Sequence, residues 1–211
     1  MNINDLRTNY SKSSINFDDL ISDPKELFKV WFNEVLSLKI NEPNAFVLST
    51  VSNQNTPSSR VVLLKEVNSN GFVFFTNYLS KKSKEIENNP FVSLNFYWPD
   101  LEKQIRITGK AIKISRAESE KYFSTRPTKS KIGAVISNQS EEISFDFCFN
   151  NEIEKNKEKF ENFPIACPEN WGGYCVFALS YEFWQGRPSR LHDRLSYILK
   201  DDVWEIRRLS P

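Results

Sequence analysis

The sequence predicts a mainly β protein of the α+β class, in which an antiparallel barrel carries peripheral helices. Short apolar runs with strand-like composition recur along most of the chain, whereas helical spacing is confined to a few segments. Tight turns at Asn70-Gly71 and Asp201-Asp202 separate such runs, so we expect neighbouring strands to pair antiparallel. With 39% apolar and 26% charged residues, the chain can bury a core and keep a polar surface. Many strands and few helices favour a barrel with helices packed outside it.

The first regular element should be a helix that follows a polar arm ending near Ile21. Asp23 can cap this helix, Pro24 suits its first position, and Glu26 can complete a capping box. Apolar residues then recur at helical spacing, namely Leu27, Trp31, Val35 and Leu38. We expect this apolar face to pack on the barrel.

The remaining elements follow from changes in hydrophobic period. Strands are expected over residues 45–51, 61–67, 72–76, 91–98, 104–115, 174–183, 195–200 and 203–207. Helices are expected over about 116–125 and 152–160, with a short one opening at Ser80 and another starting near Thr128, after Pro127.

Length and composition favour one domain in a soluble, cytoplasmic protein. No linker or internal repeat divides the 211 residues, so we expect a partly mobile arm over 1–21 and a single domain over 22–211. A net charge of +1 gives no general attraction for nucleic acid or an anionic membrane. The start of the chain has no signal-peptide pattern, and no stretch is long enough to span a bilayer.

Neither a disulfide nor a metal site is expected. The three cysteines, Cys148, Cys167 and Cys175, form no C-x-x-C pair, and the single histidine cannot complete an ordinary zinc set. The chain also lacks both glycine-rich nucleotide-binding patterns, so a phosphate would have to be bound by side chains.

A first group of phosphate donors surrounds an apolar strand. Arg60 and Lys65 end the run Arg60-Val61-Val62-Leu63-Leu64-Lys65, and in a regular strand they would face opposite sides and serve two different anions. Lys81 and Lys82 open the next helix, whose positive N-terminal end favours a phosphate. A basic solvated turn is the alternative interpretation.

A second group consists of Tyr122, Arg126 and Ser130, spaced by four residues across a bend at Pro127. A phenol, a guanidinium and a hydroxyl that converge there would suit a phosphate dianion. The alternative is an amphipathic helix in which Tyr122 packs and Arg126 is solvated.

A third group lies near the C-terminus, where Arg190-Leu191-His192-Asp193-Arg194 holds the only histidine of the chain. In an extended segment, Arg190, His192 and Arg194 would share one face and could bind an anionic or electron-rich ligand. Trp184, shortly before, could cover a planar ring, although tryptophans more often belong to a core. A solvated hairpin end with an ion pair to Asp193 is the alternative.

Taken in order, these segments resemble the pyridoxamine 5′-phosphate oxidase family from about Arg7 to Pro211. The motifs that carry the resemblance are Arg60 to Lys65, Phe75-Thr76-Asn77, Lys81-Lys82, Glu87-Asn88-Asn89-Pro90, Gln104, Tyr122 to Pro127, Gln139-Ser140, Trp171-Gly172-Gly173, Phe183 to Gly186, Arg190 to Arg194 and Arg208 to Pro211. The resemblance implies an FMN-binding split β-barrel and a homodimer with FMN at the subunit interface, each site drawing residues from both subunits.

The resemblance also implies a role for each matching residue. Arg60, Lys82 and Ser140 would bind the FMN phosphate, while the remaining flavin contacts would come from Val61, Val62, Leu63, Leu64, Lys65, Phe75, Thr76, Lys81, Gln104, Gln139, Trp184 and Arg194. The substrate phosphate would be bound by Lys65, Tyr122, Arg126 and Ser130, and Arg190, Leu191 and His192 would face the pyridine ring, with Arg190 and His192 as catalytic residues.

Two positions depart from the family pattern. Lys81 stands where the family usually has arginine, which keeps the charge but loses the bidentate fork. In the arm, Arg7-Thr8-Asn9-Tyr10 keeps only Arg7 and Tyr10 of a common Arg-Arg-Glu-Tyr segment, and the resemblance implies that these two residues contact the substrate.

The implied reaction is hydride transfer from C4′ of pyridoxamine or pyridoxine 5′-phosphate to flavin N5, with O₂ as the final acceptor. The products would be pyridoxal 5′-phosphate and H₂O₂, with NH₃ from the amine. Two alternatives stay open: another FMN-binding split barrel, such as a flavin reductase or a haem-related protein, and a nucleic-acid binder using Phe72, Phe74 and Phe75 as stacking platforms.

Overall fold

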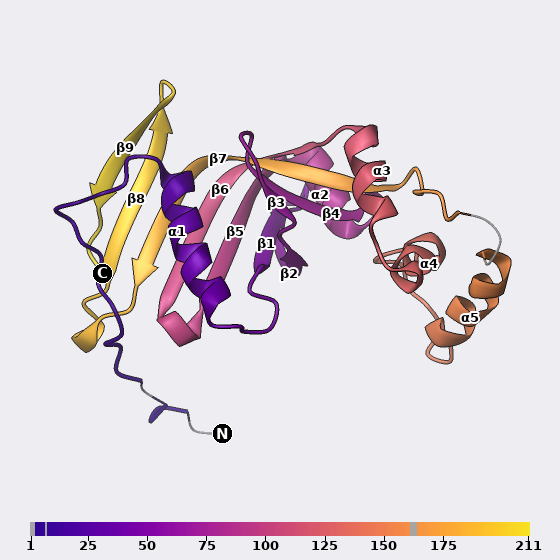
Figure 1. Ribbon diagram of the computed structural model, residues 1–211, viewed down its shortest axis with the longest axis horizontal. Coiled ribbons are helices and arrows are strands. Elements are labelled where there is room, and N and C mark those ends of the chain that lie inside the picture. Colours follow the sequence, from indigo (N-terminus) through magenta and orange to yellow (C-terminus); the bar gives the residue numbers. More distant parts are fainter. Residues whose placement is uncertain (1–2, 7, 161–163) are drawn as a thin grey trace.

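The structure is a computed structural model, which describes residues 3–6, 8–160 and 164–211. One antiparallel sheet curls into a half-barrel, with helices over its face and at one end, which confirms the predicted fold class (Figure 1). The strands are β1 (Ala45–Val51), β2 (Pro57–Leu63), β3 (Glu66–Val67), β4 (Phe72–Asn77), β5 (Phe91–Trp98), β6 (Lys103–Lys113), β7 (Trp171–Gln185), β8 (Asp193–Lys200) and β9 (Val203–Arg208). The α-helices are α1 (Pro24–Ser37), α2 (Lys81–Asn88), α3 (Arg116–Ser124), α4 (Thr128–Ile136) and α5 (Phe149–Phe160).

The sheet is organised around β7. The strand order is β2-β1-β5-β6-β7-β4-β3, with β8 paired to β7 and β9 paired to β8. The first part of β7 pairs with β4 and its last part with β8, while β6 runs along both parts. The register shifts once, because Thr108 faces Ser180 while Gly109 faces Ala178, so Leu179 is an extra residue in β7.

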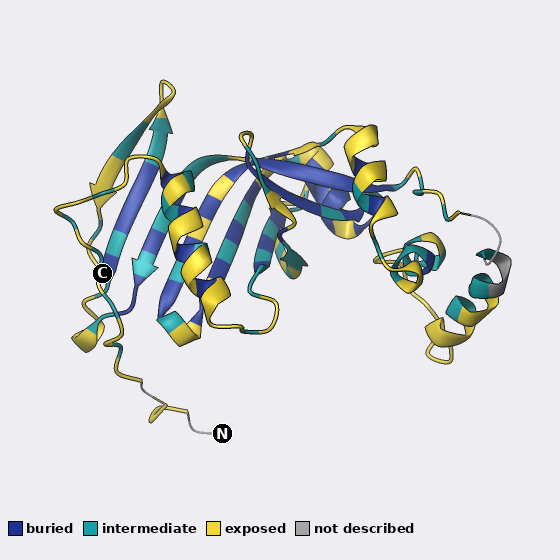
Figure 2. Ribbon diagram, in the orientation of Figure 1, coloured by how far each residue is buried: buried dark blue, intermediate teal, exposed yellow. Residues whose placement is uncertain are grey.

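Alternation along the strands builds the core. In β5 the buried residues are Val92, Leu94, Phe96 and Trp98, and Figure 2 shows such buried stripes across the sheet. Helix α1 lies over this face and contributes Phe28, whose ring meets Phe72 at 4.9 Å and Phe96 at 5.2 Å between centroids. The predicted packing of this helix on the barrel is therefore confirmed, with Phe28 in place of Leu27 as a fully buried residue.

Helix capping differs from the prediction at α1. Asp23 is the N-cap, and its Oδ1 accepts a hydrogen bond from the Lys25 N–H at 2.7 Å. Glu26 forms an ion pair with Lys29 at 2.6 Å instead of completing a capping box, so that part of the prediction was wrong. A full capping box occurs at α3, between Ser115 and Glu118.

The largest error in the predicted strands concerns residues 61–67. Strand β2 ends at Leu63, and the Leu64 N–H donates to the Asn44 carbonyl, while the Lys65 N–H donates to the Val73 carbonyl. The predicted strand therefore covers the end of β2 and the two-residue β3, which are separated by a change of partner at Leu64 and Lys65. The sequence pattern could not reveal this change, because both partners lie elsewhere in the chain.

Strand β7 starts earlier than predicted, at Trp171, because Gly172 and Gly173 belong to the strand instead of a turn. A Cβ on Gly172 would lie 2.3 Å from the Tyr78 hydroxyl, so glycine allows this close approach. The predicted tight turns are confirmed: Gly71 has φ +151 between β3 and β4, and Asp201 and Asp202 have φ 46 and 61 between β8 and β9.

Helix α4 begins at Thr128, as predicted from Pro127, and α5 starts slightly earlier than predicted, at Phe149. Both extend away from the sheet at the end opposite β8 and β9 (Figure 1). Among the residues that the structure describes, no helix is both long and apolar enough to cross a bilayer.

Carboxylates hold the described part of the N-terminal arm against the sheet. The Ser11 and Lys12 N–H groups donate to Glu102 Oε2 at 2.8 and 3.0 Å, and the Ile15 N–H donates to Asp193 Oδ2 at 3.2 Å. Because two of these bonds end on one buried carboxylate, residues 11 and 12 have a defined path. The predicted mobility of the arm stays a prediction.

Candidate active site

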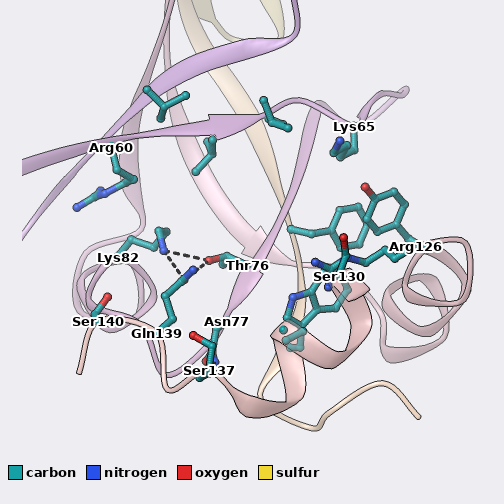
Figure 3. Close-up of a pocket in the computed structure, with 18 of the residues that line it drawn as sticks. Arg60, Lys65, Thr76, Asn77, Lys82, Arg126, Ser130, Ser137, Gln139 and Ser140 are labelled. Carbon is teal, nitrogen blue, oxygen red and sulfur yellow. Dashed lines mark hydrogen bonds between the residues drawn. The ribbon is translucent and has the colours of Figure 1, made fainter. Parts of the chain in front are cut away.

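The first two predicted groups of site residues meet in one cavity of about 970 Å³, a size typical of a cofactor site. It lies between β2, β4, the start of α2 and the α3–α4 bend (Figure 3). The predicted residues that line it are Arg60, Val61, Val62, Leu63, Lys65, Phe75, Thr76, Lys81, Lys82, Tyr122, Arg126, Ser130, Gln139 and Ser140.

Arg60 and Lys65 both line this cavity, so the prediction that they face opposite sides of a strand was wrong. The reason is the end of β2 at Leu63, which removes the regular alternation between the two residues. They lie at different ends of the cavity, Arg60 on the side of Lys82 and Lys65 on the side of Arg126 (Figure 3). The cavity therefore has two cationic ends.

At the first end, Lys82 is buried and bound only to neutral acceptors. Its Nζ donates to Gln139 Oε1 at 2.7 Å and to Thr76 Oγ1 at 3.1 Å (Figure 3), and also to Ser80 Oγ at 3.2 Å. Burial, followed by the charge of Arg60, lowers the pKa of Lys82 to about 8, against the opposing effect of Glu85. At neutral pH this lysine is mostly charged, and none of its three hydrogen-bond acceptors carries a negative charge.

The N-terminus of α2 adds to the positive character of this end. Ser140 approaches it with φ 77, and its Oγ accepts a hydrogen bond from the Lys81 N–H at 3.2 Å. The Ser80 side chain makes no capping bond to the helix backbone. Backbone N–H groups, the Lys82 ammonium and the Arg60 guanidinium thus gather where a phosphate would be well bound.

At the second end, the Arg126 guanidinium has a buried nitrogen, Nη1, without a hydrogen-bond partner. The group lies over the Trp171 ring, 4.6 Å from its centroid, and no ion pair joins it to a carboxylate within the described residues. Burial lowers the pKa of Arg126, because its charged form loses contact with water and no carboxylate in the described part of the chain replaces that contact. A partly buried guanidinium with a buried nitrogen that lacks a partner is a strong indication of an anion site.

Aromatic stacking positions the neighbours of Arg126. The Tyr122 ring stacks on Phe75 at 3.9 Å and 15°, and Phe75 is nearly parallel to Trp171 at 5.4 Å. Tyr122, Arg126 and Ser130 all face the cavity, so the predicted convergence at the Pro127 bend is confirmed.

The third predicted group lies elsewhere. Tyr10, Trp184, Arg190 and His192 line another cavity, of about 530 Å³, which shares no residue with the large one. The Trp184 ring lies 4.6 Å from His192, and Tyr10 packs edge-on against both. This group lies by the N-terminal arm and the start of β8, far along the sheet from α4 (Figure 1).

His192 is a neutral acceptor in this arrangement. Its Nδ1 accepts a hydrogen bond from the Arg187 N–H at 3.1 Å, so Nε2 carries the proton of the neutral ring. Burial and then the charge of Arg190 lower the pKa of His192. Arg190 has φ 62 and follows Ser189 with φ 56, a strained backbone of the kind found at functional sites.

The remaining predicted residues take individual positions. Arg194 is bound to Glu182 through two hydrogen bonds of 3.0 and 3.1 Å, and Gln104 lies opposite Trp184 in the β6–β7 register. Leu64 is in the core, and Leu191 is exposed beside the C-terminus. Arg7 lies outside the described residues.

Several cavity residues were absent from the predicted set, among them Asn77, Ser137 and Trp171. Trp171 and Asn77 belong to motifs that carry the family resemblance, so the sequence could have identified them as site residues. Ser137 belongs to the loop that the Asn77 side chain binds, through Nδ2 to the Ser137 carbonyl at 3.3 Å. Nothing local in the sequence marks that contact.

The curled sheet with a cavity at its side defines a protein of the split-barrel class. A solved structure from Nostoc punctiforme, titled a pyridoxamine 5′-phosphate oxidase-related, FMN binding protein, shares this fold, with a TM-score of 0.71, 14% identity and coverage of 91% of this chain and 100% of that one.

The chain belongs to the pyridoxamine 5′-phosphate oxidase family: residues 32–151 match the family model of that description, and residues 171–211 match the pyridoxine 5′-phosphate oxidase C-terminal dimerisation region. It is 50% identical to a pyridoxine/pyridoxamine 5′-phosphate oxidase of Rippkaea orientalis and 47% identical to one of Haemophilus influenzae, over the full length of each chain. A crystal structure of PhzG from Burkholderia lata with tetrahydrophenazine-1-carboxylic acid is similar with a TM-score of 0.88 and 26% identity, covering 95% of this chain and 100% of that one.

Proposed function

We propose that this protein is an FMN-dependent oxidase that converts pyridoxamine 5′-phosphate and pyridoxine 5′-phosphate to pyridoxal 5′-phosphate in vitamin B6 metabolism. The observation that carries this proposal is a single cavity with two cationic ends, one around Arg60 and Lys82 and the other around Lys65 and Arg126. Two separate phosphate sites in one cavity suit a phosphorylated cofactor beside a phosphorylated substrate. The names of the full-length relatives support the same reaction.

The first end fits the FMN phosphate. Arg60, Lys82 and Ser140 supply a guanidinium, an ammonium and a hydroxyl next to the N-terminus of α2. The backbone and side chains of residues 61–65, together with Phe75, Thr76 and Gln139, would surround the rest of the cofactor. The chemistry that bound FMN supplies is acceptance of a hydride from C4′ of the substrate, with both electrons passing to O₂ to give H₂O₂.

The second end fits the substrate phosphate. Arg126 offers a partly buried guanidinium whose Nη1 has no partner among the described residues, Lys65 an ammonium, and Tyr122 and Ser130 single hydroxyl donors. These four residues would fix the pyridine ring within the cavity and exclude water from its reacting carbon. A phosphate-free ligand would leave Arg126 unpaired, so this end favours a phosphorylated substrate.

We further propose that the working enzyme is a homodimer in which each site is completed by a second copy. The match of residues 171–211 to a dimerisation region supports dimer formation. Within one chain, Arg190 and His192 line a different cavity from Arg126, so they can reach the same substrate only from another subunit. Arg190 would then orient the substrate ring, and neutral His192 would donate a hydrogen bond through Nε2.

Gln104, Trp184 and Arg194 would contribute flavin contacts from the same second copy, and Tyr10 would contact the substrate. The proposed substrate contacts of Leu191 and Arg7 rest on the family resemblance alone. Cytoplasmic location also stays a prediction.

The test is to purify the protein and add substrate. We expect a yellow protein that releases FMN on denaturation, and H₂O₂ formation on addition of pyridoxamine 5′-phosphate. A colourless protein with no affinity for FMN would overturn the cofactor assignment and leave a nucleic-acid binder open. Bound FMN without peroxide formation from either substrate would instead indicate another FMN-binding split barrel.

A further inference from the structure

The carboxylate of Glu85, on α2, is buried beneath the Arg60 end of the cavity. Its exposed fraction is 5%, which is unusual for a glutamate. Its Oε2 accepts hydrogen bonds from Thr50 Oγ1 at 2.5 Å and Ser58 Oγ at 2.6 Å, and Arg60 Nη2 lies 3.4 Å away. Glu85 therefore connects α2 to the strands β1 and β2.

The same two hydroxyls also bind Arg60. Arg60 Nη1 donates to Thr50 Oγ1, and Nη2 donates to Ser58 Oγ, both at 2.5 Å. Each hydroxyl thus accepts a proton from the guanidinium and donates its own to the carboxylate, so every donor in the network has an acceptor. Arg60 Nη1 also lies 3.3 Å from the Leu48 carbonyl. Both terminal nitrogens of Arg60 are thereby held on the strand side.

The charge of Glu85 is stable in this position. Burial raises the pKa of its carboxyl group, but the hydrogen bonds from Ser58 and Thr50 and the charge of Arg60 outweigh that effect, and the pKa is lowered overall. The carboxylate is therefore ionised at neutral pH and remains an acceptor for both hydroxyls. Without it, the Thr50 and Ser58 hydroxyls would lose their common acceptor, and Thr50 is fully buried.

We propose that Glu85 is a positioning residue for the cofactor-phosphate end, where it fixes the Arg60 guanidinium through the Thr50 and Ser58 hydroxyls. This inference rests on the proposed function, because it takes the anion at Arg60 to be the phosphate of FMN. Glu85 itself would not contact the phosphate. Its effect on the cofactor passes through Arg60.

The test compares FMN with riboflavin, which lacks the phosphate, by fluorescence titration of the FMN-stripped protein. Glu85→Leu should weaken FMN binding about tenfold or more and leave riboflavin binding unchanged. Glu85→Gln keeps an oxygen that accepts from both hydroxyls and should stay within about threefold of the wild type. The matched control is Glu87→Leu on the same helix, where an exposed carboxylate pairs with Lys113, and no change is expected.

A double-mutant cycle with Arg60→Ala tests the route of the effect. If Glu85 acts through Arg60, Glu85→Leu should cause little further loss of FMN affinity once Arg60 is absent. An equal loss in both backgrounds would overturn the inference. Ser58→Ala, which removes one relaying hydroxyl, should also weaken FMN but not riboflavin, and it tests the same network should Glu85→Leu fail to fold.

The two proposals fail in different ways. A wild-type protein that binds FMN no better than riboflavin would overturn the assignment of the phosphate to Arg60, and the inference with it. A wild-type protein that prefers FMN, together with Glu85→Leu and Ser58→Ala variants of unchanged FMN affinity, would overturn the role of Glu85 alone.

Discussion

At the scale of single residues, Arg126 has the most informative surroundings. Its guanidinium is partly buried against Trp171, with Nη1 lacking a hydrogen-bond partner. Burying a charge without a partner costs free energy, and the free protein bears this cost until an anion binds. The binding energy of that anion should then depend strongly on Arg126.

We predict that Arg126→Ala raises the KM for pyridoxamine 5′-phosphate by roughly 10- to 100-fold, the effect of one lost charge-assisted contact. The kcat at saturating substrate should change little, because the contact is made to the phosphate and not to the reacting carbon. Steady-state peroxide production measures both constants. A loss confined to kcat would argue against a binding role.

In the proposed function, Lys82 makes the cofactor affinity depend on pH. Its lowered pKa, about 8, means that it is charged below this pH and neutral above it. The charged groups around it are Arg60, which favours the neutral form, and Glu85, which favours the ammonium. The FMN phosphate is already a dianion near neutrality, so only the lysine titrates in this range.

We therefore predict that the dissociation constant of FMN is nearly constant up to about pH 7 and rises between about pH 7 and pH 9. Lys82→Met should bind FMN weakly and show no such rise, and riboflavin binding should be flat in both proteins. Titrations at a series of pH values measure this. A flat FMN profile in the wild type would contradict the assignment of Lys82 to the phosphate.

Arg190 is expected to act on the substrate and not on the cofactor. Arg190→Ala should lower kcat/KM by about 100-fold, since the substrate ring loses its orientation over the flavin, while the protein stays yellow. Lys200→Ala, which removes an exposed cation on β8 that pairs with Glu205, is the control and should leave kcat/KM unchanged. Wild-type kcat/KM in the Arg190 variant would exclude the role.

At the scale of elements, local patterns predicted the strands that bury one face. Residues 45–51 and 91–98 were predicted with their observed bounds, because alternation alone defines a half-buried strand. The break after Leu63 was missed, since it depends on where Asn44 and Val73 offer carbonyl groups. Where a strand ends because its hydrogen-bonding partner changes, the local sequence pattern does not reveal the end.

The packing of α1 yields a stability prediction. Phe28 is fully buried against Phe72 and Phe96, so Phe28→Ala should lower the free energy of unfolding by about 3–5 kcal/mol. Val30→Ala, at an exposed position of the same helix, should cost less than about 1 kcal/mol. Urea denaturation of both variants measures the difference. Equal effects would mean that α1 does not depend on this face.

The site was predictable only where function required conspicuous residue types. Arg60, Lys65 and Arg126 stood out because cations beside apolar or aromatic residues are unusual. Glu85 did not, since a glutamate in a charged helix normally faces solvent, and its burial results from Thr50 and Ser58 on other elements. The resemblance named residues that would touch a ligand in the proposed function, but it did not name Glu85, which lies beneath Arg60.

At the scale of the whole molecule, the chain holds its proposed site in two separated parts. The α3–α4 bend, which carries Arg126, lies at one end of the sheet, and the turn before β8, which carries Arg190, lies towards the other (Figure 1). The sequence could not show this separation, because the family resemblance assigns the motifs of both parts to one site. Their separation makes the dimer a requirement for activity in the proposed function.

Subunit mixing tests this requirement. Arg126→Ala and Arg190→Ala homodimers should each be weakly active at low substrate concentration. After exchange of subunits, each mixed dimer carries one site with both wild-type residues, so the mixture should recover about a quarter of wild-type activity. The unmixed variants at equal total concentration are the control. No recovery despite proven exchange would show that both residues act within one chain.

The extra residue Leu179 determines how strand β7 tolerates insertions and deletions. Before it, β7 turns Tyr174 and Val176 inward, and after it Tyr181 and Phe183, so the inward positions change from even to odd numbers. Deleting Leu179 would restore an unbroken two-residue alternation in which Tyr181 and Phe183 still turn inward and Glu182 and Trp184 outward, because the deletion removes only the extra residue. A second residue inserted beside Leu179 would instead reverse the phase and turn Trp184, which now lies outward beside His192, towards the core, so β7 should tolerate the deletion better than the insertion.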